Sequence, residues 1–118
     1  MRTKTVAVAV ALAAGLGWAT VRAADAPAPR VVEITARRFA FTPAELHLAA
    51  GQPVTLRVTS LDVTHGFFQR ELGIDAEVAP GKPAQVTITP ARAGRYTVIC
   101  DHFCGQGHGN MRLTVVVE

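Results

Sequence analysis

Short runs of alternating apolar and polar residues, separated by proline and glycine, are the feature that most limits how this chain can fold. Such runs are typical of β-strands that bury one face, because successive side chains of a strand point to opposite sides. The runs occupy residues 30–36, 38–41, 45–49, 54–60, 84–89, 94–100 and 111–117. Residues 61–78 are less regular and are expected to contain the only long connection. The sequence therefore predicts an all-β domain, a Greek-key β-sandwich or barrel.

The N-terminal segment has the parts of a secretory signal peptide. Arg2 and Lys4 supply positive charge, residues 5–21 are apolar and rich in alanine, and Ala23 ends a small-residue cleavage signal. We therefore expect residues 1–23 to be removed on export. The alternative is a retained membrane anchor, although an apolar run of about 17 residues lies at the lower limit for crossing a bilayer.

The excess of basic residues belongs to the same segment. The whole chain has 12 basic and 9 acidic residues, and residues 1–23 contain three of the basic ones and none of the acidic ones. The remaining chain is balanced, so it lacks the basic excess that nucleic-acid binding requires. We expect residues 24–30 to be a disordered leader and residues 31–118 to be the folded domain.

Residues 100–111 concentrate the sulfur and imidazole groups of the chain. They contain both cysteines, two of the four histidines and the only methionine besides Met1. These are soft and borderline ligands, which bind copper in preference to calcium or magnesium. The segment joins the predicted strands 94–100 and 111–117, so the sandwich would hold both of its ends. The sequence thus predicts a metal-binding loop, with ligands Cys100, Cys104, His108 and Met111.

One more ligand is expected from outside the loop, and His65 is the best candidate, because it follows a predicted strand and precedes Gly66 and Phe67. A mononuclear blue copper site uses two histidines, one cysteine and a methionine, which would leave one cysteine over. A zinc site would take two cysteines and two histidines, which would leave Met111 over. A pair of copper ions would use all five side chains.

The two cysteines also allow a disulfide bond, which exported proteins commonly form. A domain of about 90 residues buries somewhat more than about 60% of its unfolded surface and folds without such a bond. The fold therefore does not require the disulfide, and the residues alone leave the disulfide and metal ligation both open.

The loop contains the pattern C-x-x-x-C-G-x-x-H-x-x-M, formed by Cys100, Cys104, Gly105, His108 and Met111. This pattern resembles the loop of the dinuclear copper A (CuA) centre in subunit II of cytochrome c oxidase, a domain of the cupredoxin family. Residues 63–67 match the segment of that family's distant histidine ligand, and residues 71–74 and 80–81 match the stretch that follows it. The resemblance covers about residues 31–118.

The resemblance implies a cupredoxin fold with two copper ions bridged by the two cysteines. His65 and His108 would each complete one copper. Met111 would be a weak ligand to one copper, and the backbone carbonyl of His102 would be a ligand to the other. Such a centre transfers single electrons, because a charge shared over two bridged metals changes the geometry little.

Three differences from the family pattern concern the partners. In many subunit II proteins the position of His102 is a glutamate that also contacts magnesium. The tryptophan-rich segment of the family corresponds here to residues 37–41, which contain no tryptophan. Membrane-bound subunits also carry one or two spanning helices, whereas this chain offers only the short run 5–21. The sequence therefore leaves the electron donor and acceptor open.

We expect an exported, periplasmic electron-transfer protein that is not an enzyme by itself, because a metal centre with every position filled leaves none for a substrate. Its partner would be a c-type cytochrome or an oxidase. The protein would be a monomer, and it would contact a membrane only if residues 1–23 are retained. The alternative is a periplasmic protein that binds copper and delivers it to a partner, in which redox chemistry is incidental.

Overall fold

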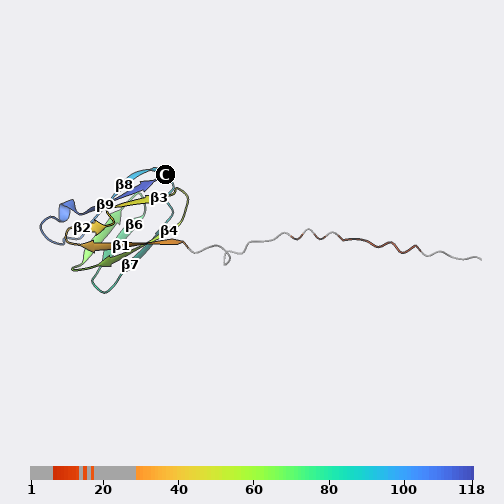
Figure 1. Cartoon of the computed structure of the whole chain (residues 1–118), viewed down its shortest axis with the longest axis horizontal. Helices are drawn as coiled ribbons and strands as arrows, with labels where there is room; N and C mark the ends of the chain where they lie inside the picture. Colours follow the sequence, from red (N-terminus) through yellow and green to blue (C-terminus); the bar gives the residue numbers. More distant parts are fainter. Residues whose placement is uncertain (1–6, 14, 16, 18–28) are drawn as a thin grey trace, which may run out of the picture.

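The computed structural model describes residues 7–13, 15, 17 and 29–118, and in it the domain is a sandwich of two β-sheets (Figure 1). The first sheet has the order β2 (Ala40–Thr42), β1 (Arg30–Arg37), β4 (Val54–Ser60) and β7 (Ala84–Ile88). The second has the order β3 (Glu45–Leu48), β9 (Arg112–Val117), β8 (Gly94–Ile99), β5 (His65–Gln69) and β6 (Ile74–Val78). The pairs β1–β4 and β3–β9 are parallel, and the other pairs are antiparallel.

The core lies between the two sheets and follows the period-2 pattern of the strands. In β4, Val54, Leu56 and Val58 are buried, and the residues that alternate with them are half-buried. Phe41 of the first sheet and Phe67 of the second pack edge to face, with 5.5 Å between their ring centres. This aromatic contact joins the two sheets at a point two residues from His65.

The predicted all-β sandwich is confirmed, but the prediction for residues 61–78 was wrong. This stretch holds two strands, β5 and β6, instead of one long connection. In β6 the burial alternates, with Ile74 and Val78 buried and Asp75 and Glu77 exposed. The alternation of apolar and polar residues was therefore present in the sequence, but over five residues only. β5 does not alternate, because Gly66 is buried as well as its neighbours. A local pattern cannot report burial of that kind.

The second difference concerns residues 38–41, which the sequence predicts as a strand. Strand β2 begins only at Ala40, and Arg38 and Phe39 form the turn between β1 and β2. This turn lies at the same end of the sandwich as the predicted metal loop, as the contact between Arg38 and Cys104 shows. The two residues are therefore placed near the loop instead of within a sheet.

The predictions for the N-terminal segment fall mostly outside the described residues. Residues 7–13, 15 and 17 form neither helix nor strand, and the cleavage position after Ala23 is not among the residues described. Within the described part of the chain, no helix has the length and hydropathy needed to cross a membrane. Arg30, which the sequence places both at the end of the leader and at the start of the first predicted strand, pairs with Val54 and begins β1. The signal peptide, the anchor and the leader stay predictions.

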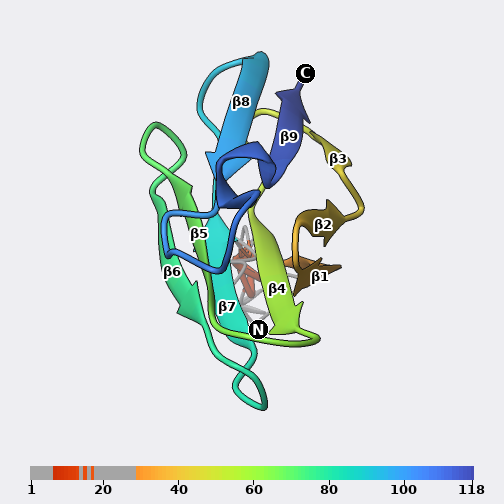
Figure 2. The ribbon, with the colours of Figure 1, turned by 90° about the vertical axis from the view of Figure 1, so that its left-hand side faces the viewer.

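The loop between β8 and β9 covers one end of the sandwich. Figure 2 looks onto this end, with the loop and its single 3-10 turn, η2 (His108–Asn110), in front of the sheets. Strands β1 and β4 run toward this end in parallel, and β5 starts there with His65. Segments that are far apart in the sequence therefore meet beneath one loop.

The aromatic contact between the sheets predicts the effect of Phe67→Ala. Removing a fully buried phenylalanine leaves a cavity and should lower the free energy of unfolding by about 3–5 kcal/mol. Denaturation of the metal-free protein by urea measures the change. The control is Phe103→Ala, since the Phe103 side chain is 74% exposed and should change the free energy by less than about 0.5 kcal/mol. Equal losses in the two variants would contradict this packing.

Candidate metal centre

The β8–β9 ladder holds the two ends of the candidate metal loop together. Ile99 pairs with Arg112, and one residue further the Cys100 N–H donates to the Met111 carbonyl over 3.3 Å. Cys100 and Met111 are both buried, although each lies outside its strand. The first and last predicted ligands of the loop are thus neighbours through backbone hydrogen bonding.

The two cysteines are buried free thiols that face each other. Their Sγ atoms lie 3.7 Å apart, well beyond the length of about 2.05 Å of a disulfide bond. Half of that separation is shorter than a metal–sulfur bond of about 2.3 Å. Both sulfur atoms can therefore bind the same ion, on either side of the line that joins them.

An imidazole lies beside each sulfur atom. His65, the first residue of β5, is completely buried, and its Nδ1 lies 4.0 Å from the Cys100 Sγ. His108, the first residue of η2, is half-buried, and its Nδ1 lies 3.7 Å from the Cys104 Sγ. The donor atoms of His65, Cys100 and Cys104 all lie within 4.8 Å of one another. Each of the two sulfur atoms therefore has one histidine ring beside it.

A thioether and a carbonyl oxygen complete the surroundings of the sulfur atoms. The Met111 Sδ lies 3.9 Å from the Cys104 Sγ, and the His102 carbonyl oxygen lies 3.2 Å from the Cys100 Sγ. The His102 ring is exposed, and its Nδ1 lies 3.1 Å from the Phe103 carbonyl oxygen. The backbone of His102, and not its imidazole, therefore faces the thiols. The other four predicted site residues therefore all lie around the sulfur pair of Cys100 and Cys104.

Comparison with known proteins identifies the family of this chain. The family model described as "Cupredoxin-like domain" matches residues 6–116. The chain belongs to the cupredoxin-like family. It is 37% identical over 92 residues to cytochrome c oxidase subunit 2 of Thermus thermophilus, covering 78% of this chain and 68% of that protein. The resemblance drawn from the loop pattern is confirmed at the level of the family.

One further protein is similar in sequence, and one solved structure is similar in fold. The chain is 36% identical over 91 residues to nitrous-oxide reductase of Cupriavidus necator, covering 74% of this chain but only 14% of that protein. The periplasmic domain of subunit II of cytochrome oxidase (CoxB) of Bradyrhizobium japonicum aligns with a TM-score of 0.71 at 18% identity, over 79% of this chain and 86% of that domain. The second comparison shows a common fold.

Asp62 holds the buried histidine of this cupredoxin in one orientation. Its Oδ1 lies 2.6 Å from the His65 Nε2 and also accepts the Val63 N–H at 2.7 Å. Its Oδ2 accepts the Arg38 N–H at 2.8 Å. With a carboxylate at Nε2, the proton of a neutral His65 belongs on that nitrogen, and Nδ1 is left with its lone pair toward the sulfur atoms.

The surroundings shift the pKa values of Asp62 and Cys104 in opposite directions. Desolvation alone would raise the pKa of Asp62, but the hydrogen bonds from Arg38, His65 and Val63 outweigh it and lower the pKa from 3.8 to about 2. Desolvation raises the pKa of the Cys104 thiol from 9.0 to about 11, and the neighbouring Cys100 adds to the rise. A metal ion would supply the positive charge that a buried thiolate needs.

Gly66 brings β5 into direct contact with the loop. Its N–H donates to the Cys100 Sγ over 3.4 Å. A Cβ at this position would lie 2.0 Å from the Asp101 Oδ1 and 2.7 Å from the backbone nitrogens of Asp101 and His102. Only a residue without a side chain therefore allows this approach, which places the His102 carbonyl beside Cys100.

Sequence reasoning missed three of the residues that build the site. Asp62 is hydrogen-bonded to His65, and Arg38 donates to the Cys104 carbonyl. Gly66, which donates to the Cys100 Sγ, was noted only as part of a matching motif. The spacing Asp-x-x-His of residues 62–65 is a local signal that could have identified Asp62. Arg38 has no comparable signal, because it lies 66 residues before the cysteine whose carbonyl it contacts.

The contact between Asp62 and His65 predicts that Asp62→Asn will weaken metal binding. The variant removes the charge opposite Nε2, and losses of about 10–100-fold in affinity are typical when such an outer carboxylate is changed. Competition with a Cu(I) chelator measures the affinity. Asp75→Asn changes an exposed acid of β6 by the same chemistry and serves as the control. Unchanged affinity in Asp62→Asn would contradict the positioning role.

The close approach at Gly66 predicts a specific failure of Gly66→Ala. The added methyl group must displace the backbone of Asp101 and His102, at a cost of about 1–3 kcal/mol or more in the free energy of unfolding. The copper spectrum should change together with stability, because the shifted backbone carries a predicted ligand. Thermal unfolding and absorption spectra measure both. Gly109→Ala is the control, since a Cβ there meets nothing within 4 Å.

Proposed function

We propose that this protein is an exported electron-transfer domain that holds two copper ions in a dinuclear centre of the CuA type. The observation that carries the proposal is the pair of buried free thiols 3.7 Å apart, with an imidazole nitrogen beside each. A thioether and a backbone carbonyl on the same pair support it further. This donor set is richer in sulfur than a mononuclear blue copper site.

Each donor has a proposed role in this centre. Cys100 and Cys104 bridge the two ions, which their mutual distance permits. His65 and His108 bind one ion each, in keeping with their positions beside different sulfur atoms. Met111 is a weak ligand to one ion, and the carbonyl of His102 is a ligand to the other. Zinc would leave the buried thioether of Met111 without a role.

When bound, such a copper pair takes up and gives away one electron at a time. The protein's part is to keep the donors in place while this happens. The ladder beneath Cys100 and Met111 fixes two donors, and Asp62 fixes the ring of His65. Burial of both thiols keeps water away from the sulfur atoms. A rigid, dry site of this kind lowers the rearrangement that electron transfer requires.

The domain is proposed to be an electron carrier and not an enzyme in its own right. Four donors surround the sulfur pair and bring the total to six, so two ions would find their positions occupied by the protein. A catalytic metal site keeps a position open for water or substrate. In relatives that are parts of larger enzymes, a domain of this kind would supply electrons to chemistry that takes place elsewhere.

A c-type cytochrome or an oxidase subunit is the proposed redox partner, in the periplasm. Exposed apolar side chains gather at the end of the sandwich that carries the loop: Phe39 is 38% exposed, Leu61 62% and Phe103 74%. The Phe103 ring lies 5.9 Å from the ring of His108. A partner that covers these side chains would come close to a proposed copper ligand. We propose a monomer that presents this end to its partner.

Copper delivery is the second candidate, and a cavity of about 220 Å³ beside Cys104 favours it. Arg38, Thr64, His102 and Phe103 line the cavity together with Cys104. Through such an opening a partner could approach the Cys104 segment and exchange copper. A delivery protein should lose copper quickly to a competing chelator. A carrier should hold it and show a reversible one-electron couple in voltammetry.

The deciding experiment is reconstitution of the metal-free protein with copper, followed by metal analysis and electron paramagnetic resonance. The proposal predicts two coppers per chain and a hyperfine pattern of one electron shared equally by two copper nuclei. One copper per chain with the pattern of a single nucleus, or preferential binding of zinc, would refute the dinuclear centre.

Cys104→Ser tests the bridging role in the same assay. Loss of one bridging thiolate should remove the shared-electron pattern and reduce the metal content to one copper per chain or less. Met111→Leu is the matched control, because it removes only the proposed weak ligand and should keep two coppers with a changed reduction potential. A shared-electron spectrum that survives in Cys104→Ser would show that the bridging assignment is wrong.

A further inference from the structure

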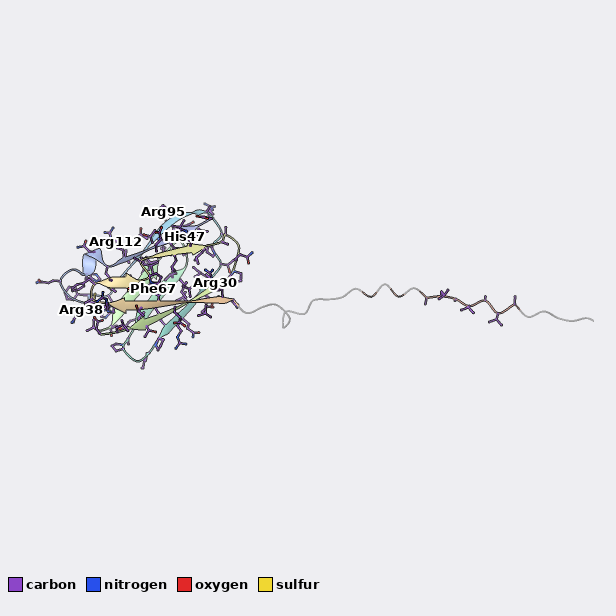
Figure 3. All side chains as sticks on the ribbon, in the orientation of Figure 1. Arg30, Arg38, His47, Phe67, Arg95 and Arg112 are labelled. Atoms are coloured by element: carbon purple, nitrogen blue, oxygen red, sulfur yellow. The ribbon has the colours of Figure 1, made fainter. Side chains whose placement is uncertain are left out.

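The turn between β1 and β2 is in contact with both parts of the metal centre. The Arg38 Nε donates to the Cys104 carbonyl over 2.8 Å, and the Arg38 N–H donates to the Asp62 Oδ2 over 2.8 Å. Asp62 in turn holds His65. Figure 3 labels Arg38 at the end of the sandwich that carries the loop. One arginine therefore links the segment of the buried histidine to the segment of the second cysteine.

Phe39 fixes the same turn against the loop. A Cβ on Gly105 or Gly107 would lie 3.1 Å from the Phe39 ring, so the ring packs directly on the backbone of both glycines. Both glycines have positive φ, 135° and 105°, which leaves no place for larger residues. The ring thus covers the stretch between Cys104 and His108. Because Phe39 is packed in this way, the backbone of the preceding residue, Arg38, is held in place beside the loop.

The guanidinium group also places a permanent positive charge at the loop. The positive charge of a guanidinium group is delocalised over its three nitrogen atoms, one of which is the Nε that donates here. The contact through the Cys104 carbonyl is partly buried, which reduces screening by water. Reduction of a metal centre adds one negative charge to it. A fixed positive charge nearby therefore favours the reduced form and raises the reduction potential.

We propose that Arg38 is a positioning residue of the metal centre, which holds the Cys104 segment in register with the Asp62–His65 pair and raises the reduction potential by its charge. The residue lies in the segment where this chain departs from the tryptophan-rich pattern of the CuA domains. The statement about the potential rests on the proposed copper function. The statement about positioning concerns the metal-free protein and stands without it.

Three substitutions separate the hydrogen bond from the charge. In Arg38→Gln an amide nitrogen occupies the place of Nε, so the donor remains and the charge is lost. Arg38→Lys keeps the charge and puts a methylene group in the place of the donor. Arg38→Met removes both. The backbone N–H that Asp62 accepts is present in every variant, so each one tests the side chain alone.

The first measurement is amide hydrogen exchange over residues 100–111 of the metal-free protein. Arg38→Met and Arg38→Lys should exchange about threefold to tenfold faster than the natural chain, which is what loss of one hydrogen bond implies. Arg38→Gln should stay close to the natural rate. Arg37→Gln, at the exposed neighbouring position, is the control and should leave the rate unchanged. An unchanged rate in Arg38→Met would overturn the positioning role.

The second measurement is the reduction potential of the copper-loaded proteins. It should fall in Arg38→Gln and Arg38→Met, stay near the natural value in Arg38→Lys, and fall less in Arg37→Gln. Equal shifts in Arg37→Gln and Arg38→Gln would overturn the role of the contact at Cys104. If the natural chain does not bind two coppers, the proposed function fails, while the exchange experiment still decides the positioning role of Arg38.

Discussion

The hydrogen-bonded ladder between β8 and β9 is the constraint on which the metal centre depends. It brings Cys100 and Met111 side by side, so the loop between them starts and ends at donor atoms. A loop closed in this way has few conformations to lose when it orders, which lowers the entropy cost of gathering its donors. The sandwich beneath contributes His65 from a strand whose first three residues are all buried. The rigidity of the sheet is thus passed on to the site.

A set of polar contacts around this loop orients the donor atoms, which apolar packing alone does not do. Asp62 directs the His65 ring, Gly66 donates to a thiol, and Arg38 binds the backbone of Cys104. The second and third contacts join segments distant in the sequence, and all three give a polar group of a buried residue a partner. In a buried site such bonds are strong, and a missing partner would be costly. The same contacts that satisfy these atoms also orient the donors.

Local patterns predicted the parts of the structure that depend on local physics. β4 alternates strictly and was predicted with the bounds it has, because alternate burial in a sheet produces that pattern. The ligand loop was predicted because its donors lie within one short segment. β5 was missed because Gly66 is buried by the loop and not by the sheet. Arg38 was missed as part of the site because its partner comes from the other end of the domain.

By itself the sequence determined the class of the fold, the family and the residue types at the metal loop. Each of these follows from residues close together in the sequence, either from the alternation of apolar and polar side chains or from the spacing of the ligands. Only the tertiary structure decided that two thiols face each other at 3.7 Å as free groups, that Gly66 lies against the backbone of Asp101 and His102, and that Arg38 links both halves of the site. These features depend on how distant segments pack together. No local rule of sequence carries that information.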